Sequence, residues 1–220
     1  MSDKKTFFNS TFWITCAVCL MPLALGFYLW EKLPEEIPMQ YGWNGQVNWT
    51  LPKAPAVFAC PAVCLVLNII MQVSFYLKGG RISRKTAAIF CWIIPVLSVA
   101  VNSFIILKPA GLDLSAEKFV LPLCSIFFII IGNYLPKTEP NHIIGIRAPW
   151  INKNPEVWRK TNRIAGILFV AAGIINLAAA FTEAGKYIFV SSIIAVWLFL
   201  LVYSIIIAKK EAAEEGSAGQ

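Results

Sequence analysis

The most reactive side chains in this chain are six cysteines and a single histidine. Cys16 and Cys19 have the Cys-x-x-Cys spacing of thiol redox pairs and of zinc sites. A zinc site needs further ligands nearby, and His142 lies far away in the sequence. All six cysteines fall within strongly apolar stretches, where a thiol packs as a small apolar side chain. We therefore expect no metal site, no cofactor and no disulfide.

Catalytic motifs are absent from the sequence. It contains no Gly-x-Ser-x-Gly elbow, no His-Glu-x-x-His and no glycine-rich phosphate loop. Acid–base chemistry would have to use loop carboxylates such as Glu139 and Glu156, which we expect to be solvated. The apolar stretches contain no ionisable Asp, Glu, Lys or Arg, and proton- or cation-coupled pumps generally need such a group. The pattern predicts a protein that is neither an enzyme nor an ion-coupled pump.

Amide side chains lie inside the apolar stretches instead. Their simplest role is hydrogen bonding between helices, worth about 0.6–2 kcal/mol each. The alternative is a substrate path lined by amides, and prolines in the same stretches favour it because broken helices form some transporter sites. The amides are Asn68, Gln72, Asn102, Asn133 and Asn176.

Two long loops are rich in unusual residues. The first, 33–53, contains three prolines, and glycines on either side of Trp43-Asn44 permit a tight turn with positive φ. Its tryptophans suit a membrane interface, where the ring meets lipid and the N–H meets water. One interpretation is therefore anchoring by an aromatic belt. The other is an ordered cap that contacts a ligand.

The second loop, 132–166, leads into a predicted interfacial helix. Asn154-Pro155-Glu156 has the pattern of an N-cap, a first-turn proline and an acidic first turn. The segment before it, 145–150, is too apolar for a free linker and too interrupted for a helix, so we expect it to fold against helix ends. Arg147 would then donate to helix C-terminal carbonyls or to a lipid phosphate. A ligand-binding role for Arg147 remains the alternative.

The second loop also carries a long motif. It consists of Gly132-Asn133-Tyr134-Leu135-Pro136-Lys137, Asn141, Gly145-Ile146-Arg147, Pro149-Trp150 and Trp158-Arg159-Lys160-Thr161 with Arg163. This motif resembles the SdpI family of bacterial multi-spanning membrane proteins over about residues 119–208. The first loop, with its Leu-Pro-x-x-Ile-Pro start, Gly45 and Lys53, resembles the domain of unknown function that often precedes that family in one chain.

The resemblance implies six spans, a bacterial inner membrane and a role in resisting a secreted toxic peptide. It also implies a link from toxin sensing to capture of a cytoplasmic repressor. The family pattern commonly has histidine where this chain has Gln40 and Asn162, so neither position can carry a histidine's metal or proton switch here.

Two groups of candidate binding residues follow from these patterns. In the motif loop they are Asn133, Pro136, Asn141, Gly145, Arg147, Pro149, Trp150, Trp158, Arg159, Thr161 and Arg163. In the first loop they are Pro34, Pro38, Gln40, Trp43, Gly45, Trp49 and Lys53.

The elements that position these loops follow from composition. Of the 220 residues, 58% are hydrophobic and 14% are charged, whereas a soluble domain is roughly a quarter charged. A bilayer core of about 30 Å needs roughly 20 apolar residues as helix, and backbone groups in lipid must be satisfied within the segment. The sequence therefore predicts an all-α membrane protein. Six apolar stretches approach the required length: 12–30, 56–77, 87–107, 119–135, 164–182 and 187–208.

Basic residues predict the orientation. With these six spans, 14 of the 19 Lys and Arg residues fall in the even-numbered loops and the two ends, so the positive-inside rule places both termini in the cytoplasm. The first loop is then extracellular and the motif loop cytoplasmic. We predict an N-terminal three-helix region over 1–115 with an ordered loop 31–55. An SdpI-like region over 116–210 with the motif loop 136–163 would follow, and then a disordered tail over 211–220.

The leading hypothesis is non-catalytic immunity to, or detection of, a secreted toxic peptide, with relay to a cytoplasmic regulator. Expected partners are membrane lipids, a toxic peptide on the outer side and a cytoplasmic repressor, without direct binding of nucleic acid. The alternative is a transporter or channel for a small molecule or lipid.

Overall fold

The computed structural model describes residues 9–42, 45–78, 82–113, 115–141 and 143–218. The chain divides into two compact units, Met1–Ala116 and Glu117–Gln220, and each is described by itself. Among the described residues, six helices are long and apolar enough to cross a membrane. The prediction of a six-span, all-α membrane protein is confirmed.

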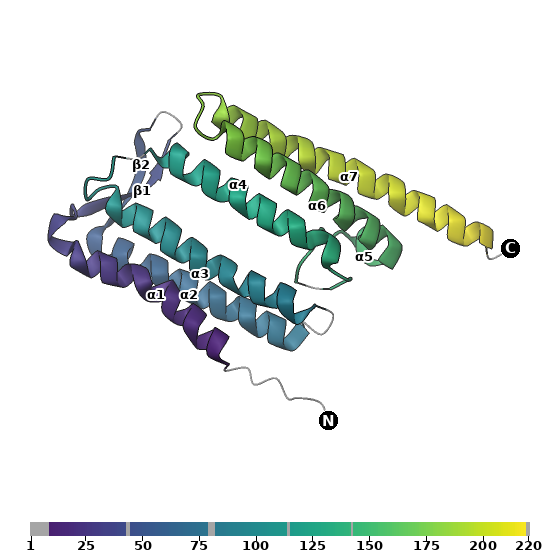
Figure 1. The fold of residues 1–220 in the computed structure, drawn as a ribbon, viewed down its shortest axis with the longest axis horizontal. Helices are drawn as coiled ribbons and strands as arrows, with labels where there is room; N and C mark the ends of the chain where they lie inside the picture. Colours follow the sequence, from purple (N-terminus) through teal and green to yellow (C-terminus); the bar gives the residue numbers. More distant parts are fainter. Residues whose placement is uncertain (1–8, 43–44, 79–81, 114, 142, 219–220) are drawn as a thin grey trace. The chain divides into compact units, whose positions relative to one another are not determined.

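The described part of the first unit contains three spanning helices (Figure 1). They are α1 (Ser10–Tyr28), α2 (Lys53–Lys78) and α3 (Arg84–Leu107). The side chain of Asn9 accepts the N–H of Phe12 and begins α1, and Ser83 accepts the N–H of Thr86 and begins α3, as N-caps do. The three helices pack against one another.

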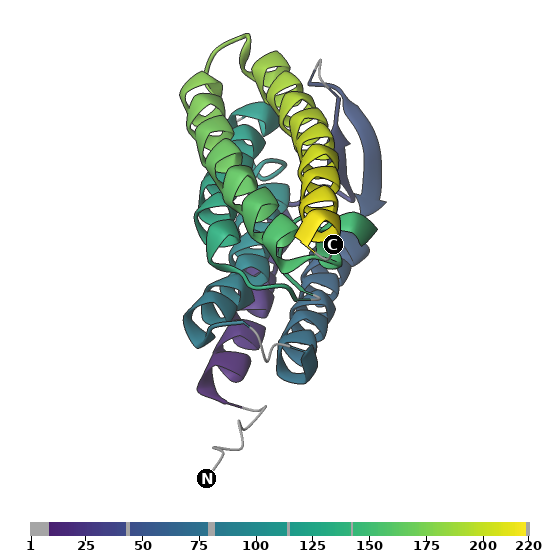
Figure 2. The ribbon, with the colours of Figure 1, turned by 90° about the vertical axis from the view of Figure 1, so that its right-hand side faces the viewer.

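A β-hairpin connects α1 to α2 (Figures 1 and 2). After the 3₁₀ turn η1 (Trp30–Lys32), β1 (Glu36–Tyr41) pairs in antiparallel fashion with β2 (Val47–Pro52). The described residues of loop 33–53 contain a two-stranded sheet that the sequence pattern does not predict. Its prolines concealed the strand pattern, because proline is usually excluded from paired strands. Trp43 and Asn44, which we expected in the turn, lie outside the described residues.

The second unit contains the other three spanning helices. They are α4 (Ala116–Tyr134), α6 (Pro155–Ala179) and α7 (Gly185–Ala218). The boundary between the units falls after Ala116, the first residue of α4. The 3₁₀ turn η3 (Leu135–Lys137) and the short helix α5 (Pro149–Asn152) lie in the motif loop. A Cβ at Gly132 would lie 2.8 Å from the backbone oxygen of Gly166. Small residues therefore bring α4 and α6 to close approach, as is common in membrane helices.

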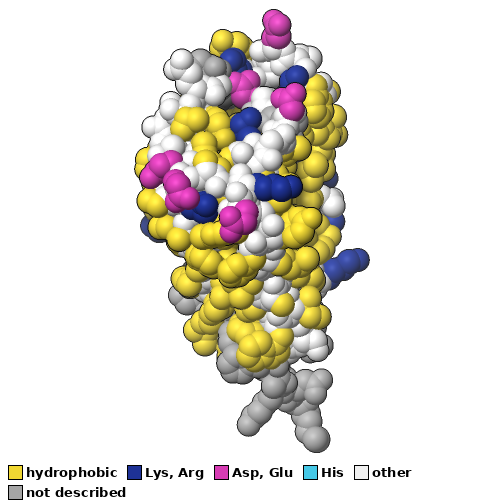
Figure 3. Space-filling model, turned by 90° about the vertical axis from the view of Figure 1, so that its left-hand side faces the viewer, with side chains coloured by type: hydrophobic (Ala, Val, Ile, Leu, Met, Phe, Trp, Pro, Cys, Tyr) yellow, Lys and Arg dark blue, Asp and Glu magenta, His cyan; other side chains and the backbone are white. Residues whose placement is uncertain are grey.

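Large hydrophobic side chains cover much of the helix surface (Figure 3). On α7, for example, Trp197 is 52% exposed and Leu198 is 59% exposed. A water-soluble protein rarely exposes apolar patches of this extent. These faces suit contact with lipid.

The C-terminal end differs from the expectation. The sequence predicts a disordered tail over 211–220, whereas α7 continues as a helix to Ala218. Two ion pairs lie along the extension: Lys160 Nζ is 2.6 Å from Glu211 Oε1, and Lys210 Nζ is 3.7 Å from Glu214 Oε1. Only the first of these pairs reaches another helix, α6. Residues 219–220 lie outside the described part of the chain.

Candidate functional site

Lys53 closes the base of the hairpin. Its backbone N–H donates to the Glu35 oxygen at 2.8 Å, and its Nζ donates to Glu35 Oε1 at 3.1 Å. The same ammonium lies 5.2 Å from the centre of the Trp30 ring, a cation–π distance. Lys53 is therefore the point where β2 ends, α2 begins and β1 is joined.

Further contacts stabilise the turn of the hairpin and strand β1. Gly45 has φ +77° and donates its N–H to the Gly42 oxygen at 2.9 Å, a conformation that favours glycine. Lys108, at the end of α3, lies 5.2 Å from the centre of the Tyr41 ring. Burial raises the pKa of the Tyr41 phenol. The contact with Lys108 ties β1 to the end of α3.

An apolar cluster beneath the hairpin anchors it to the helices. Ile37 is fully buried and contacts a cluster that includes Val57 of α2 and Ile106 of α3. The candidate residues of this loop differ in burial: Pro34, Gln40 and Trp49 are exposed and Pro38 is half-buried. Gln40 lies opposite Trp49 across the strand pair.

In the motif loop, the amide of Asn141 holds a tight turn. Its Oδ1 accepts the N–H groups of Ile143 and Ile144, both at 2.7 Å. Its Nδ2 donates to the oxygens of Glu139 at 2.7 Å and Ile144 at 3.0 Å. All of the usual hydrogen-bonding capacity of this amide is used by the loop backbone. His142 lies outside the described residues.

Trp158 is the buried centre of the loop. Its Nε1–H donates to the Thr138 oxygen at 3.0 Å, and the residue is 1% exposed. Gly145 lies against the ring: it has φ +130°, and a Cβ there would lie 2.6 Å from Trp158 Cζ2. Glycine is required at 145 for both conformation and space.

Asn162 joins the loop to α6. Its Oδ1 accepts the N–H of Ile146 at 2.8 Å, and its Nδ2 donates to the Trp158 oxygen at 3.1 Å. At the position where the family pattern commonly has histidine, this chain therefore has an amide that holds the backbone next to Arg147. The neighbouring Thr161 is fully buried, and its Oγ1 has no hydrogen-bond partner within the described part of the chain.

The predicted start of the interfacial helix is confirmed. Asn154 Oδ1 accepts the N–H groups of Glu156 at 2.8 Å and Val157 at 3.3 Å, and α6 begins at Pro155. Glu156 then pairs with Arg159 at 2.6 Å. This N-cap and its first-turn ion pair agree with the sequence pattern.

The candidate residues of the motif loop separate into interior and surface groups. The interior group consists of the buried Asn141, Trp158 and Thr161, together with Gly145, which is half-buried against the Trp158 ring. The surface group consists of Asn133, Pro136, Arg147, Pro149, Trp150, Arg159 and Arg163. Within the second group, Pro136 also contacts Gly166, and the Trp150 Nε1–H donates to Ser204 Oγ of α7 at 3.1 Å.

Sequence reasoning missed the contribution of α7 to this site. Ser204 and the buried Glu211 bind Trp150 and Lys160, and Ile207 packs against the cluster around Trp158. The spacing of Ser204 and Glu211 at i and i+7 places them on one helix face. This spacing is the sequence pattern that could have indicated a shared partner for the two residues.

Intramembrane amides serve helix adhesion in both units. Asn102 Nδ2 of α3 contacts Cys64 Sγ of α2 at 3.8 Å, and Asn176 Nδ2 of α6 donates to Ser192 Oγ of α7 at 2.9 Å. Gln72 Nε2 donates to Thr15 Oγ1 at 2.9 Å. Within the ranges that the structure describes, no three His, Cys, Asp or Glu residues are placed to hold a metal ion.

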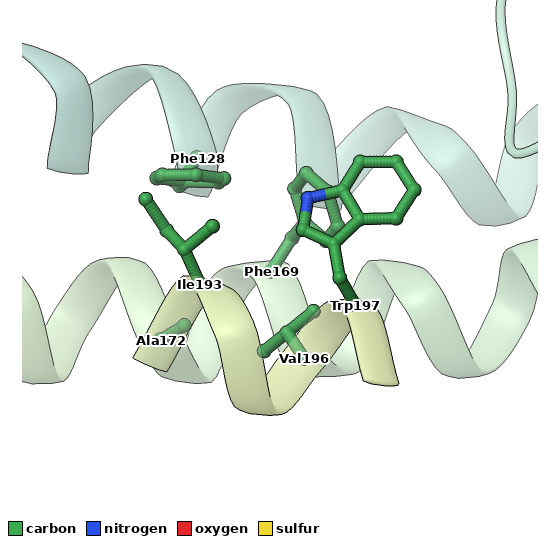
Figure 4. A pocket seen from close by; sticks show the side chains of 6 residues that line it. All are labelled: Phe128, Phe169, Ala172, Ile193, Val196 and Trp197. Atoms are coloured by element: carbon green, nitrogen blue, oxygen red, sulfur yellow. The ribbon is translucent and has the colours of Figure 1, made fainter. Parts of the chain in front are cut away.

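A small apolar pocket lies among the helices of the second unit (Figure 4). Phe128 and Phe169 meet edge to face there, with ring centres 5.1 Å apart. Because the lining is apolar, the pocket suits a hydrocarbon group. Its lining residues are Phe128, Phe169, Ala172, Ile193, Val196 and Trp197.

Comparison with known proteins gives family matches over both units. Residues 137–208 match the SdpI/YfhL protein family, and residues 17–65 match a domain of unknown function, DUF1648. The chain is 31% identical over 196 residues to the immunity protein SdpI of Bacillus subtilis (strain 168), covering 84% of this chain and 87% of that protein. No solved structure matches the chain.

The family matches and the six spanning helices agree with one another. They place the protein in the bacterial inner membrane as a multi-pass protein. The chain belongs to the SdpI family.

Proposed function

We propose that this protein gives immunity to, or detects, a secreted toxic peptide, without catalysis. The observation that carries the proposal is the similarity to an immunity protein over 84% of the chain. It is supported by two ordered loops, which have the preorganised character that lowers the entropic cost of binding. In this proposal, the hairpin contacts the peptide and the motif loop relays the signal to a cytoplasmic regulator.

The proposed topology separates these two roles across the membrane. Three spanning helices, α2, α3 and α4, lie between the hairpin and the motif loop in the sequence. If every span crosses once, an odd number of crossings puts the two loops on opposite faces. The positive-inside rule then places the hairpin outside and the motif loop, with both termini, in the cytoplasm.

The motif loop offers a basic surface on a rigid support. Arg147, Arg159 and Arg163 are exposed, while the backbone beside Arg147 is held by Asn162. A soluble regulator with an acidic face would complement this surface. In this proposal, the regulator binds the arginines and the interior residues only hold the backbone.

Expression in sensitive bacteria tests the immunity role. We expect cells that carry the protein to survive a toxic peptide from a broad panel that kills cells without it. Unchanged killing across the panel, with the protein present in the membrane, would contradict the proposal. Gly145→Val serves as a comparison, because it disturbs the motif loop through the Trp158 ring and leaves the hairpin sequence unchanged.

A pull-down tests the relay. Wild-type protein should retain a cytosolic regulator that Arg147→Ala loses, while Asn152→Ala, an exposed change on α5, should retain it. Equal retention by Arg147→Ala would contradict the basic-surface role. Transport of a small molecule or lipid is the alternative function; solute flux into liposomes that requires Asn102 or Asn176 would favour it.

A further inference from the structure

The two outer edges of the hairpin are protected differently. β1 carries the charged Glu36 and a proline at 38, and the end of α3 contacts it through Lys108 and Tyr41. Charges, prolines and covering elements are the usual ways in which proteins block unpaired strand edges. β2 has no charged residue, its one proline, Pro52, is at its end, and the helix that contacts it is α2, which follows it directly in the chain. Among the described residues, β2 pairs with β1 alone.

The register of the hairpin identifies the open donor on β2. Lys53 N–H donates to Glu35 O, so the pair 35/53 is hydrogen-bonded. Pairs alternate along an antiparallel ladder, and Pro38 lies opposite Thr50 three steps on. The pair 38/50 is therefore a non-hydrogen-bonded pair, which suits a proline. By the same alternation, the N–H and C=O of Thr50 point away from β1.

We propose that β2 binds an extended segment of a foreign peptide by adding it as a third strand at the edge that contains Thr50. Only an extended polypeptide offers alternating donors and acceptors at the spacing of a strand edge. The exposed apolar side chains that precede Thr50 are uncharged: Trp49, directly before it, is 53% exposed, and Val47, three residues before it, is 46% exposed. They suit a peptide that presents apolar side chains at alternate positions. This inference rests on the proposed function and names its mode of recognition.

A second copy of the same chain fits this edge less well. In a two-fold antiparallel pairing centred on Thr50, Pro52 of each copy would face residue 48 of the other. Because proline has no N–H, a donor would be missing at both ends of that short ladder. A foreign strand need not carry a proline, so at most one donor is missing from its ladder, at Pro52 of β2.

Binding to the full-length protein in lipid nanodiscs tests the proposal. The probe is a labelled octapeptide of alternating Lys and Val. Its control is the same peptide with the backbone nitrogen of every second residue methylated. Methylation removes the N–H donors along one edge of the peptide strand and keeps every side chain. We expect the unmethylated peptide to bind at least tenfold more tightly than the methylated control, after subtraction of binding to empty nanodiscs. Equal affinities, or no binding of either peptide, would overturn the proposal.

Thr50→Pro and Thr50→Ala form the matched pair of variants. Thr50→Pro removes the outward N–H at a position where the β1–β2 ladder does not use it, and Thr50→Ala keeps it. We expect about a tenfold loss of peptide affinity for Thr50→Pro and near wild-type affinity for Thr50→Ala. Equal affinities for the two variants would contradict edge pairing. An unchanged Trp fluorescence spectrum checks that Thr50→Pro keeps the hairpin.

Two further outcomes separate the alternatives. Efficient disulfide cross-linking of Thr50→Cys between copies, without peptide binding, would assign the edge to a second copy and overturn the peptide occupant. Edge pairing without protection against any toxin would leave the binding site in place and refute the immunity role alone. The two proposals therefore fail by different measurements.

Discussion

The hairpin and the motif loop are both ordered, but different interactions hold them. The hairpin is a backbone ladder whose side-chain contacts are few and partly exposed, such as Lys53 with Glu35. The motif loop has little regular structure, and buried side chains of Asn141, Trp158 and Asn162 bind its backbone directly. A ladder leaves its side chains free for contact with a partner. A loop held by side chains loses its shape when one interior residue changes.

We expect the largest effect from Gly145→Ala. The new Cβ would lie 2.6 Å from the Trp158 ring, and the φ of +130° at this position strains any residue other than glycine. Overpacking and backbone strain together should lower the free energy of unfolding by about 4 kcal/mol. Thermal unfolding in detergent measures the loss. The matched control is Gly111→Ala. Gly111 also has a positive φ (+112°), but no atom lies within 4 Å of the position that its Cβ would take. Equal losses for the two variants would show that Trp158 does not restrict the loop.

Asn141→Ala should follow, at about 3 kcal/mol. The N–H groups of Ile143 and Ile144 would lose their acceptor, and each buried unsatisfied group costs about 1–3 kcal/mol. Hydrogen exchange of these two amides measures the effect locally. Asn152→Ala, an exposed change on the same loop, should alter neither amide. Unchanged protection in Asn141→Ala would show that the backbone holds the turn unaided.

Trp158→Phe should have an intermediate effect of about 1.5 kcal/mol. The change keeps most of the buried ring but removes the Nε1–H bond to the Thr138 oxygen, which leaves a buried carbonyl without its donor. Trp150→Phe is the comparison, because the bond of Trp150 to Ser204 lies at a residue that is 37% exposed. Unfolding midpoints in urea should fall more for Trp158→Phe. The reverse order would contradict the interior role of Trp158.

Glu35→Gln in the hairpin should have the smallest effect, below about 0.5 kcal/mol. The Glu35 side chain is 92% exposed, and exposed ion pairs contribute little because water and salt screen them. The small loss should vanish at high salt. A loss above about 1 kcal/mol would show that the hairpin depends on this ion pair rather than on its ladder and the buried Ile37.

Much of the fold was predictable because the membrane imposes it. Six apolar stretches of the right length can only be helices in lipid, and the structure has them. The cap at Asn154 was readable because an N-cap is a local pattern. The strands were not readable, because Pro38 and Pro52 interrupt the pattern and only the register shows that their missing N–H groups are unneeded.

The motif loop stands out in the sequence, but the contacts that its residues make do not. Gly145 and Trp158 stand out in the sequence, yet nothing local shows that they lie against one another or that Trp158 binds the Thr138 oxygen. Ser204 and Glu211 reach the loop from α7, more than 50 residues away along the chain. Such pairings depend on how α6 and α7 pack.

Six apolar stretches were enough to predict six membrane-spanning helices, because a backbone in lipid must satisfy its own hydrogen bonds. The same stretches also indicate where two loops interrupt the helices. The pairing of β1 with β2, and the buried amides and indole that hold the motif loop, became visible only in the folded chain. The reason is that hydrogen-bond partners distant in sequence become neighbours only when helices pack and strands pair.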